Sequence, residues 1–318
     1  MPRFTTLVTA AQWTLEAERI VQAAGGEIAY LEGAVTEERL AERLAATRTE
    51  ALVLRGSPPV TARVLAASPA LRIVAKNGAG VDSVDLAEAG RRGIAVAVAP
   101  GANAYAVAEH ALAMMLALVR GLPQLDRSLR AGGWADAAYR GRDFRGCAVG
   151  IVGYGAIGRH TAQLAAMLGA QVCVLRRRGT ADGFAVEADL LRLAPRVDVL
   201  SLHCPLTEAT RGLVGARELA ALRPGAILLN TARGAVVDEA ALVAALQSGH
   251  LAGAGLDTFA TEPLPADSPL RHMDQVILTP HVAGVTRDAA ARVSMLTAAN
   301  VVDHLAGRAL PPGHCINA

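Results

Sequence analysis

A strand, a glycine-rich turn and a helix follow one another at residues 148–168, and they constrain the fold of this chain more than any other feature. Ala148–Val152 is a short apolar run, which predicts a buried strand. Gly153, Gly155 and Gly158 then form the pattern G-x-G-x-x-G at the start of a helical segment. The first glycine makes a tight turn, the second lets the backbone approach a pyrophosphate, and the third lets the helix pack against the strand. The residues predicted to contact a dinucleotide in this turn are Gly153, Tyr154, Gly155, Ala156, Ile157 and Gly158.

Basic residues follow the next predicted strand, Gln171–Leu175. A chain that binds NAD usually has an acidic residue at this position to hold the ribose 2′-hydroxyl. Here the sequence is Arg176, Arg177 and Arg178. Guanidinium groups bind a 2′-phosphate through charge-assisted hydrogen bonds, whereas a carboxylate would repel it. The sequence therefore predicts that NADP(H) is preferred and that NAD(H) is possible; the alternative is a solvated basic loop that touches no ligand.

The rest of the chain alternates strands and helices, which predicts an α/β protein with doubly wound parallel sheets. At 318 residues, two domains are expected. Pro100–Asn103 resembles a hinge between them, and residues 285–307 have the pattern of an amphipathic helix. The strands predicted before the hinge are 5–8, 28–31, 51–54, 71–75 and 94–98; the six predicted after it are 148–152, 171–175, 197–202, 226–230, 252–256 and 276–279.

Composition excludes several classes of function. A net charge of +2 gives no basic field for nucleic acid, and the four cysteines show no spacing typical of a metal site. The longest apolar stretch, residues 104–119, contains Glu109 and His110 and is short for a bilayer. No signal-peptide pattern opens the sequence, so we expect a cytoplasmic protein without membrane contact. The segment 104–120 is apolar nearly all round, which indicates a buried helix or a subunit interface.

Three polar residues each follow the end of a predicted strand. Arg233 follows the strand 226–230, Glu262 follows the strand 252–256, and His281 follows the strand 276–279. Ligands of open parallel sheets bind at that edge. Arg233 can hold a carboxylate and polarise the adjacent carbonyl, His281 can donate a proton, and Glu262 can orient the imidazole and favour its protonated form. The three residues are the predicted catalytic group for hydride transfer to a 2-keto acid.

The sequence resembles the D-isomer-specific 2-hydroxyacid dehydrogenase family from about Ala51 to Asn317. The motifs that carry the resemblance are Gly78–Asp82, Pro100–Asn103 with Val107–His110, Val152–Gly155, His203–Thr207, Asn230–Gly234, Leu256–Phe259 with Glu262–Pro265, and Thr279–Gly284.

The resemblance implies a flavodoxin-like substrate domain formed by residues 1–99 plus 285–318 and a Rossmann cofactor domain formed by residues 100–284. It implies the catalytic roles given above, a cleft that closes on substrate, and a homodimer formed through the helix 104–120. It adds Asp257 as a contact to the nicotinamide carboxamide, and the amides of Ala79 and Gly80 as holders of the substrate carboxylate. The further cofactor contacts that it implies are His203, Cys204, Pro205, Thr207, Thr231, Ala232 and Gly284; the predicted substrate contacts are Arg55, Lys76, Gly78, Ala79, Gly80 and Arg233.

Departures from the family pattern suggest the substrate. Arg176 replaces the acid of NAD-using members, as in reductases of glyoxylate and hydroxypyruvate that use NADPH. We therefore expect an oxidoreductase that reduces one of these small 2-keto acids. Arg55 and Lys76, the only lysine of the chain, lie where phosphoglycerate-type members have basic substrate contacts, which leaves an NAD-dependent phosphoglycerate-type dehydrogenase as an alternative. A third reading is a dinucleotide-binding corepressor, a class that shares this fold.

Overall fold

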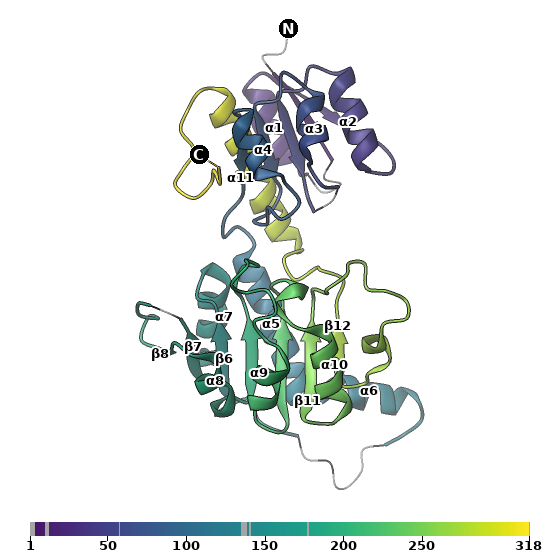
Figure 1. Ribbon diagram of the computed structural model, residues 1–318, viewed down its shortest axis with the longest axis vertical. Coiled ribbons are helices and arrows are strands. Elements are labelled where there is room, and N and C mark those ends of the chain that lie inside the picture. The colour runs from purple at the N-terminus through teal and green to yellow at the C-terminus, as the bar shows by residue number, and fades with distance from the viewer. Residues whose placement is uncertain are drawn as a thin grey trace. The chain divides into compact units, whose positions relative to one another are not determined.

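The computed structural model describes residues 4–9, 13–56, 58–134, 139, 141–176 and 178–317 (Figure 1). The chain divides into two compact units. One contains the described residues up to Asn103 together with those from Val285 onward, and the other contains Ala104–Gly284.

The first unit contains a five-stranded parallel sheet in the order β2-β1-β3-β4-β5. This is the flavodoxin order, in which the chain reverses direction across the sheet between β1 and β3. The elements are β1 (Phe4–Val8), α1 (Leu15–Ala23), β2 (Gly26–Tyr30), α2 (Glu37–Ala46), β3 (Ala51–Leu54), α3 (Ala62–Ala67), β4 (Ile73–Lys76), α4 (Leu86–Arg91), β5 (Ala95–Ala97) and α11 (Arg287–Leu305).

Two apolar cores lie on the two faces of this sheet. Leu40 and Leu44 of α2 and Val64 of α3 pack in one core, and Val21 of α1 packs with Val301 of α11 in the other. The strands β3 and β4 are buried at every position, so they contribute to both cores. This burial on both faces explains why these strands read as continuous apolar runs rather than as alternating patterns.

The second unit contains a seven-stranded parallel sheet in the order β12-β11-β10-β9-β6-β7-β8. Its first six strands in chain order have the dinucleotide-binding arrangement 3-2-1-4-5-6. The elements are α5 (Ala104–Val119), α6 (Leu122–Arg130), β6 (Ala148–Val152), α7 (Ala156–Met167), β7 (Gln171–Leu175), β8 (Ala185–Glu187), α8 (Leu190–Leu193), η1 (Ala194–Arg196), β9 (Val199–Leu202), α9 (Ala216–Ala221), β10 (Ala226–Asn230), η2 (Gly234–Val236), α10 (Glu239–Gln247), β11 (Leu251–Leu256), η3 (Pro269–His272) and β12 (Val276–Leu278).

Helices cover both faces of this sheet as well. Figure 1 shows α5 behind the sheet and α9 and α10 in front of it. Met115 of α5 packs in one core with Ala162 of α7, and Leu219 of α9 packs in the other with Leu242 of α10. All strands run parallel, so the loops that follow β6, β7, β9, β10, β11 and β12 emerge at one edge of the sheet. The predicted catalytic and cofactor residues lie on these loops or at the start of α7.

The prediction of two doubly wound parallel sheets is confirmed, and the structure differs in two details. Among the described residues, seven strands follow residue 103 instead of six. The additional strand, β8, has three residues with no buried side chain, so no apolar pattern reveals it in the sequence. The polar stretch after residue 121 contains α6, none of whose side chains is buried. A helix without a buried face leaves no apolar signal for a core.

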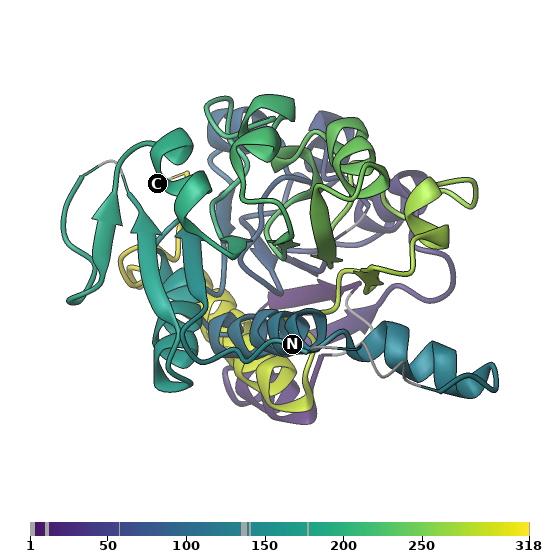
Figure 2. The ribbon, with the colours of Figure 1, turned by 90° about the horizontal axis from the view of Figure 1, so that it is seen from below.

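Helix α6 follows α5 after a bend of 62° and extends away from the sheet of its own unit (Figure 2). No single helix in the described chain is long and apolar enough to cross a membrane. The bent pair α5 and α6 would reach the required length and composition only when taken together.

Candidate active site

The glycine turn between β6 and α7 has the geometry that a dinucleotide needs. Gly153 has φ +93°, and a Cβ there would lie 2.8 Å from the Cys204 amide nitrogen. A Cβ on Gly158 would lie 2.0 Å from the Gly153 carbonyl oxygen. Gly155, by contrast, has no atom within 4 Å of the place where its Cβ would be. Two glycines are therefore required by the protein itself, and the third leaves open the space where a pyrophosphate would approach the start of α7.

The loop after β9 packs against this turn. His203 is buried, its Nε2 lies 2.9 Å from Ser201 Oγ, and its Nδ1 lies 3.5 Å from Thr231 Oγ1. Burial lowers the pKa of His203 to about 3, and burial raises the pKa of the neighbouring Cys204 thiol. Both side chains are therefore uncharged near neutral pH. Further along the loop, the Thr207 amide and the Thr210 hydroxyl are hydrogen-bonded at 2.8 Å, which fixes the loop beyond Pro205.

At the end of β7, one of the three predicted arginines makes contacts within the protein. Arg176 is half-buried, donates to the Thr180 carbonyl, and lies 6.0 Å from the centre of the Tyr154 ring. Arg178 is exposed and forms no ion pair with any residue that the structure describes. Arg177 lies outside the described residues. The residues that directly follow the strand are thus basic, as the sequence predicts.

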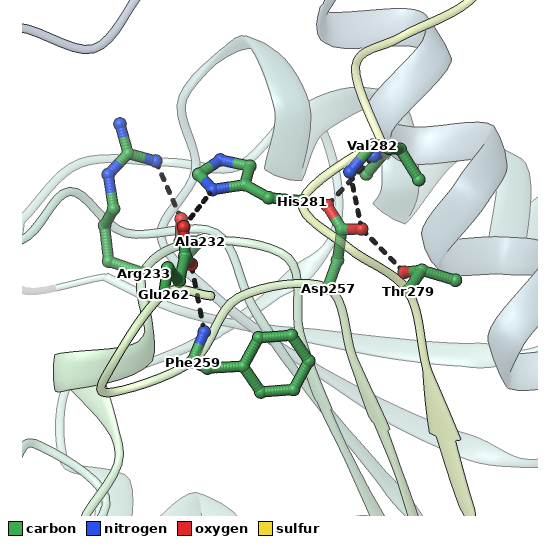
Figure 3. A network of polar contacts seen from close by, with 9 residues as sticks. Ala232, Arg233, Asp257, Phe259, Glu262, Thr279, His281 and Val282 are labelled. Atoms are coloured by element: carbon green, nitrogen blue, oxygen red, sulfur yellow. Dashed lines mark hydrogen bonds and ion pairs between the residues drawn. The ribbon is translucent and has the colours of Figure 1, made fainter. Parts of the chain in front are cut away.

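The loop after β10 presents Arg233. Asn230 is buried, and its side chain joins two points of this loop: its Oδ1 accepts from the Ala232 amide at 3.0 Å, and its Nδ2 donates to the Arg233 carbonyl at 2.9 Å. The Arg233 guanidinium donates to the Ala232 carbonyl at 2.7 Å (Figure 3). A Cβ on the next residue, Gly234, would lie 1.9 Å from the Phe259 carbonyl carbon, so only glycine lets this loop meet the loop after β11.

Glu262 and His281 meet across the loops that follow β11 and β12. Figure 3 shows the imidazole of His281 pointing toward the Glu262 carboxylate, with Nδ1 and Oε2 2.8 Å apart. A carboxylate accepts, so Nδ1 donates and Nε2 faces away from Glu262. The second oxygen, Oε1, accepts from the Phe259 amide at 3.1 Å, which fixes the carboxylate. Both side chains are partly exposed, as groups that meet a substrate must be.

Asp257 holds the loop that carries His281. Its side chain is 1 % exposed; Oδ1 accepts from Thr279 Oγ1 at 2.6 Å and from the Val282 amide at 2.8 Å, and Oδ2 accepts from the Ala283 amide at 2.9 Å. These bonds flank His281, whose φ of +54° is in the left-handed region. Asp257 thus holds the Thr279 side chain before His281 and the backbone amides of Val282 and Ala283 after it. The contact with a nicotinamide carboxamide, implied by the resemblance, stays a prediction.

His110 of α5 adds to the same network. Its Nε2 lies 3.1 Å from Thr279 Oγ1 and 4.0 Å from Asp257 Oδ1. The single hydroxyl proton of Thr279 goes to the carboxylate, so His110 Nε2 must carry the proton that Thr279 accepts.

Sequence reasoning did not assign Asn230, Thr279 or His110 to the site. Their spacing along the chain carries no signal, because each acts through a partner that only the fold brings near. Asn230 and Thr279 do lie at the carboxyl ends of β10 and β12, so a search for polar residues at strand ends could have found them.

The predicted substrate contacts before the hinge lie in the first unit. Lys76 ends β4 and is buried, and its Nζ donates to the Gly56 carbonyl at 3.0 Å and to Ser83 Oγ at 2.8 Å. It therefore joins the loop after β3 to the loop after β4. Arg55 is exposed. The Gly78 amide and carbonyl are both bonded within the unit, while the amides of Ala79 and Gly80 donate to no acceptor among the described residues.

No group of three or more His, Cys, Asp or Glu side chains in the described parts of the chain could hold a metal ion. The four cysteines are all unpaired thiols. The residues that could hold an organic cofactor are those of the glycine turn, the loop after β9 and the strand ends described above.

Comparison with known proteins agrees with this geometry. Residues 112–283 match the family model described as "D-isomer specific 2-hydroxyacid dehydrogenase, NAD binding domain". D-3-phosphoglycerate dehydrogenase of Mycobacterium tuberculosis is 41 % identical over 90 % of this chain, which spans only 54 % of that enzyme's length. (S)-Sulfolactate dehydrogenase of Chromohalobacter salexigens is 40 % identical over 81 % of this chain and 85 % of its own.

A solved structure has the same two-domain fold. The NADPH-dependent glyoxylate/hydroxypyruvate reductase of Sinorhizobium meliloti, determined in complex with citrate, is 32 % identical and has a TM-score of 0.85 over 98 % of this chain and 97 % of its own. With the glycine turn, the strand-end residues and these matches taken together, the chain belongs to the D-isomer-specific 2-hydroxyacid dehydrogenase family.

Proposed function

We propose that this protein is a reductase of small 2-keto acids that prefers NADP(H), with glyoxylate or hydroxypyruvate as substrate and the D-hydroxy acid as product where the product is chiral. The observation that carries the proposal is the hydrogen bond of 2.8 Å between His281 Nδ1 and Glu262 Oε2, formed at the same sheet edge as the glycine turn. An imidazole oriented in this way can deliver a proton from its other nitrogen.

The three catalytic residues divide the work on the substrate. Arg233 binds the carboxylate of the keto acid and polarises the carbonyl. His281 gives a proton from Nε2 to the oxygen that becomes the hydroxyl. The Glu262 carboxylate orients the ring and stabilises its positive charge before the proton leaves. In the opposite direction the same imidazole takes the hydroxyl proton, so the group serves oxidation as well as reduction.

The cofactor contacts follow from the turn and the strand ends. Gly153, Gly155 and the start of α7 would hold the pyrophosphate, and Arg176 with Arg178 would hold a 2′-phosphate. A bound nicotinamide dinucleotide supplies the hydride. His203, neutral because it is buried, and Thr231 would line the cofactor without adding charge. The remaining proposed contacts are Cys204, Pro205, Thr207, Ala232, Asp257 and Gly284.

The loop at residues 78–80 is proposed to bind the substrate carboxylate through the amides of Ala79 and Gly80. The hydrogen bonds of Lys76 to Gly56 and Ser83 favour a supporting role for this residue, in which it positions both loops of the first unit. We infer a homodimer formed through α5, in line with the family resemblance. Sedimentation equilibrium would report twice the mass of the 32.8-kDa chain.

A phosphoglycerate-type dehydrogenase is the second candidate. Two observations favour it: the identity of 41 % to an enzyme of that name, and the exposed basic side chain of Arg55. A phosphorylated substrate has a second anionic group that such a cation would bind. Glyoxylate and hydroxypyruvate have only their carboxylate.

Initial rates distinguish the two candidates. Glyoxylate, hydroxypyruvate and 3-phosphohydroxypyruvate are each compared with NADPH and with NADH. The proposal predicts the highest kcat/KM for one of the first two substrates with NADPH. Turnover confined to the phosphorylated substrate would support the second candidate, and Arg55→Glu should then remove it. Binding of both dinucleotides without turnover of any keto acid would contradict both enzymatic proposals.

A further inference from the structure

Four side chains gather at the end of β7, next to the glycine turn; we call them the arginine cluster: Tyr154, Arg159, Arg176 and Asp182. Asp182 Oδ2 accepts from Tyr154 Oη at 3.0 Å and lies 3.2 Å from Arg159 Nε. The guanidinium groups of Arg159 and Arg176 lie 5.5 Å and 6.0 Å from the centre of the Tyr154 ring. The Asp182 carboxylate thus pairs with Arg159, and the guanidinium groups of Arg159 and Arg176 both lie over the Tyr154 ring.

The position of Asp182 is built into the backbone. The Phe184 amide donates to the Ala181 carbonyl at 2.8 Å, and the two residues between them, Asp182 and Gly183, have φ of +47° and +89°. These are the features of a type I′ turn, in which Asp-Gly is a favoured pair. Phe184 then packs edge-on against the Tyr154 ring at 6.5 Å. The turn therefore delivers the carboxylate to the cluster and anchors it there.

The surroundings of Tyr154 also determine where its hydroxyl proton lies. Partial burial, and then the hydrogen bond to Asp182, raise the pKa of Tyr154. The hydroxyl stays protonated at neutral pH and donates to Asp182. The Asp182 carboxylate accepts from this hydroxyl and faces the Arg159 guanidinium.

This carboxylate stands close to where a 2′-phosphate would bind. In dinucleotide-binding sheets, the ribose 2′ position lies at the end of the second strand, which here is β7 with Arg176. A phosphate needs cations and is repelled by a nearby carboxylate. Asp182 is 46 % exposed and Arg159 is 50 % exposed, so solvent and ligands reach the pair.

We propose that Asp182 is an internal counter-ion of the arginine cluster that competes with the 2′-phosphate of NADP(H), and thereby limits the preference of this protein for NADP(H) over NAD(H). The inference rests on one part of the proposed function, namely that the arginines face the 2′ position of the cofactor ribose. Without a 2′-phosphate, Asp182 pairs with Arg159 and keeps the cluster ordered. When a 2′-phosphate binds, the arginines must satisfy two anions instead of one.

Calorimetric titration with adenine nucleotide fragments tests the proposal without turnover. The probes are 2′,5′-ADP and 5′-AMP, which differ only in the 2′-phosphate. Asp182→Asn removes the charge and keeps a residue type that tolerates the left-handed region. We expect it to bind 2′,5′-ADP about threefold or more tightly than the wild type, while affinity for 5′-AMP stays within about twofold. The gain should shrink at 0.5 M salt, that is about a 4-Å Debye length, because the pair is exposed.

Asp274→Asn is the matched control. Asp274 is an exposed, ion-paired aspartate of the same unit, partnered by Arg127, and its loss changes the net charge equally. It should alter neither affinity. Asp182→Gly, which also suits a positive φ, repeats the test if the asparagine variant folds poorly.

Two results would overturn the proposal. Unchanged or weaker binding of 2′,5′-ADP by both Asp182 variants would leave Asp182 as a turn residue only. Weaker binding of 5′-AMP would assign it to the ribose hydroxyls. If the wild type binds both probes equally, the NADP(H) preference is wrong, but the difference between wild type and variant still tests the role of Asp182.

Discussion

The loops after β10, β11 and β12 carry the proposed catalytic residues, and we call them the catalytic loops. They and the arginine cluster are held in different ways. The catalytic loops are held by the buried side chains of Asn230 and Asp257, whose hydrogen bonds go to backbone amides, to one carbonyl and to the Thr279 hydroxyl. The arginine cluster is held by a half-exposed ion pair and by ring contacts. Buried hydrogen bonds fix a geometry, whereas exposed ion pairs contribute little stability and change easily.

This difference suggests a division of labour. Proton transfer depends on distances of a fraction of an ångström, so its residues lie on loops clamped to the sheet. Cofactor choice depends on the balance of charges, which a solvated cluster can provide without rigid geometry. Changes in the catalytic loops should therefore affect kcat, and changes in the arginine cluster should affect the affinity for one cofactor over the other.

The largest expected effect is at His281. His281→Gln removes the proton donor and should lower kcat by about 10²–10⁴-fold. The KM for NADPH should stay within about twofold, since the imidazole contacts Glu262 and not the glycine turn. Steady-state rates over a range of NADPH concentrations measure both quantities. A variant with near wild-type kcat would show that another group donates the proton.

The next largest effect is expected at Asp257, whose hydrogen bonds hold the loop that carries His281. Asp257→Asn has one acceptor oxygen where the carboxylate has two, for three donors. We expect kcat to fall by about 10²-fold through misplacement of His281. The free energy of unfolding should fall by about 1–3 kcal/mol, because a buried donor loses its partner. Urea titration and kcat are measured together, with Asp303→Asn, an ion-paired aspartate of α11, as the control. Loss of stability with full kcat would show that Asp257 serves folding alone.

A pair of glycine variants sharpens the contrast between space required by the fold and space left for a ligand. Gly155→Ala meets no protein atom within 4 Å, so its Tm should equal that of the wild type while NADPH binding weakens by at least about tenfold. Gly158→Ala places its Cβ 2.0 Å from the Gly153 oxygen and should lower stability by about 1–3 kcal/mol. Melting curves and NADPH titrations check both. Unaltered binding by Gly155→Ala would argue against a pyrophosphate at this turn.

The smallest effect concerns His203 and pH. Burial lowers its pKa from an ordinary 6.5 to about 3, so the unfolded chain binds a proton below pH 6.5 that the folded protein does not. Folding stability should therefore decrease as the pH falls below 6.5, by at most about 1.4 kcal/mol per pH unit from this group. Urea unfolding at pH 7.5, 6.0 and 5.0 should show a steeper loss for the wild type than for His203→Gln. Equal slopes would mean that His203 is protonated in the folded state.

The sequence predicts the parts of this molecule that bury continuous apolar runs. The strands β3, β6, β7 and β10 have the bounds expected from the sequence, because each packs apolar side chains into a core. The elements that were not expected, β8 and α6, have no buried side chain.

In the candidate site, the sequence reveals the positions of single residues but not their partners. Arg233, Glu262 and His281 follow strand ends, a position that the sequence reveals. Their partners Asn230, Asp257 and Thr279 also lie at strand ends, but no local pattern shows which residues they contact. Asp257 reaches the Val282 amide 25 residues later, and Asp182 reaches Tyr154 28 residues earlier. Such contacts depend on how strands are paired in the sheet, which no local pattern encodes.

The division between the catalytic loops and the arginine cluster is tested most directly by Arg176→Glu. The measurement is kcat and kcat/KM on glyoxylate or hydroxypyruvate with NADPH and with NADH. We predict that the ratio of kcat/KM for NADPH to that for NADH falls by at least about tenfold, while kcat at saturating NADH stays within about twofold of the wild type. An unchanged ratio, or a kcat that collapses with both cofactors, would contradict the division.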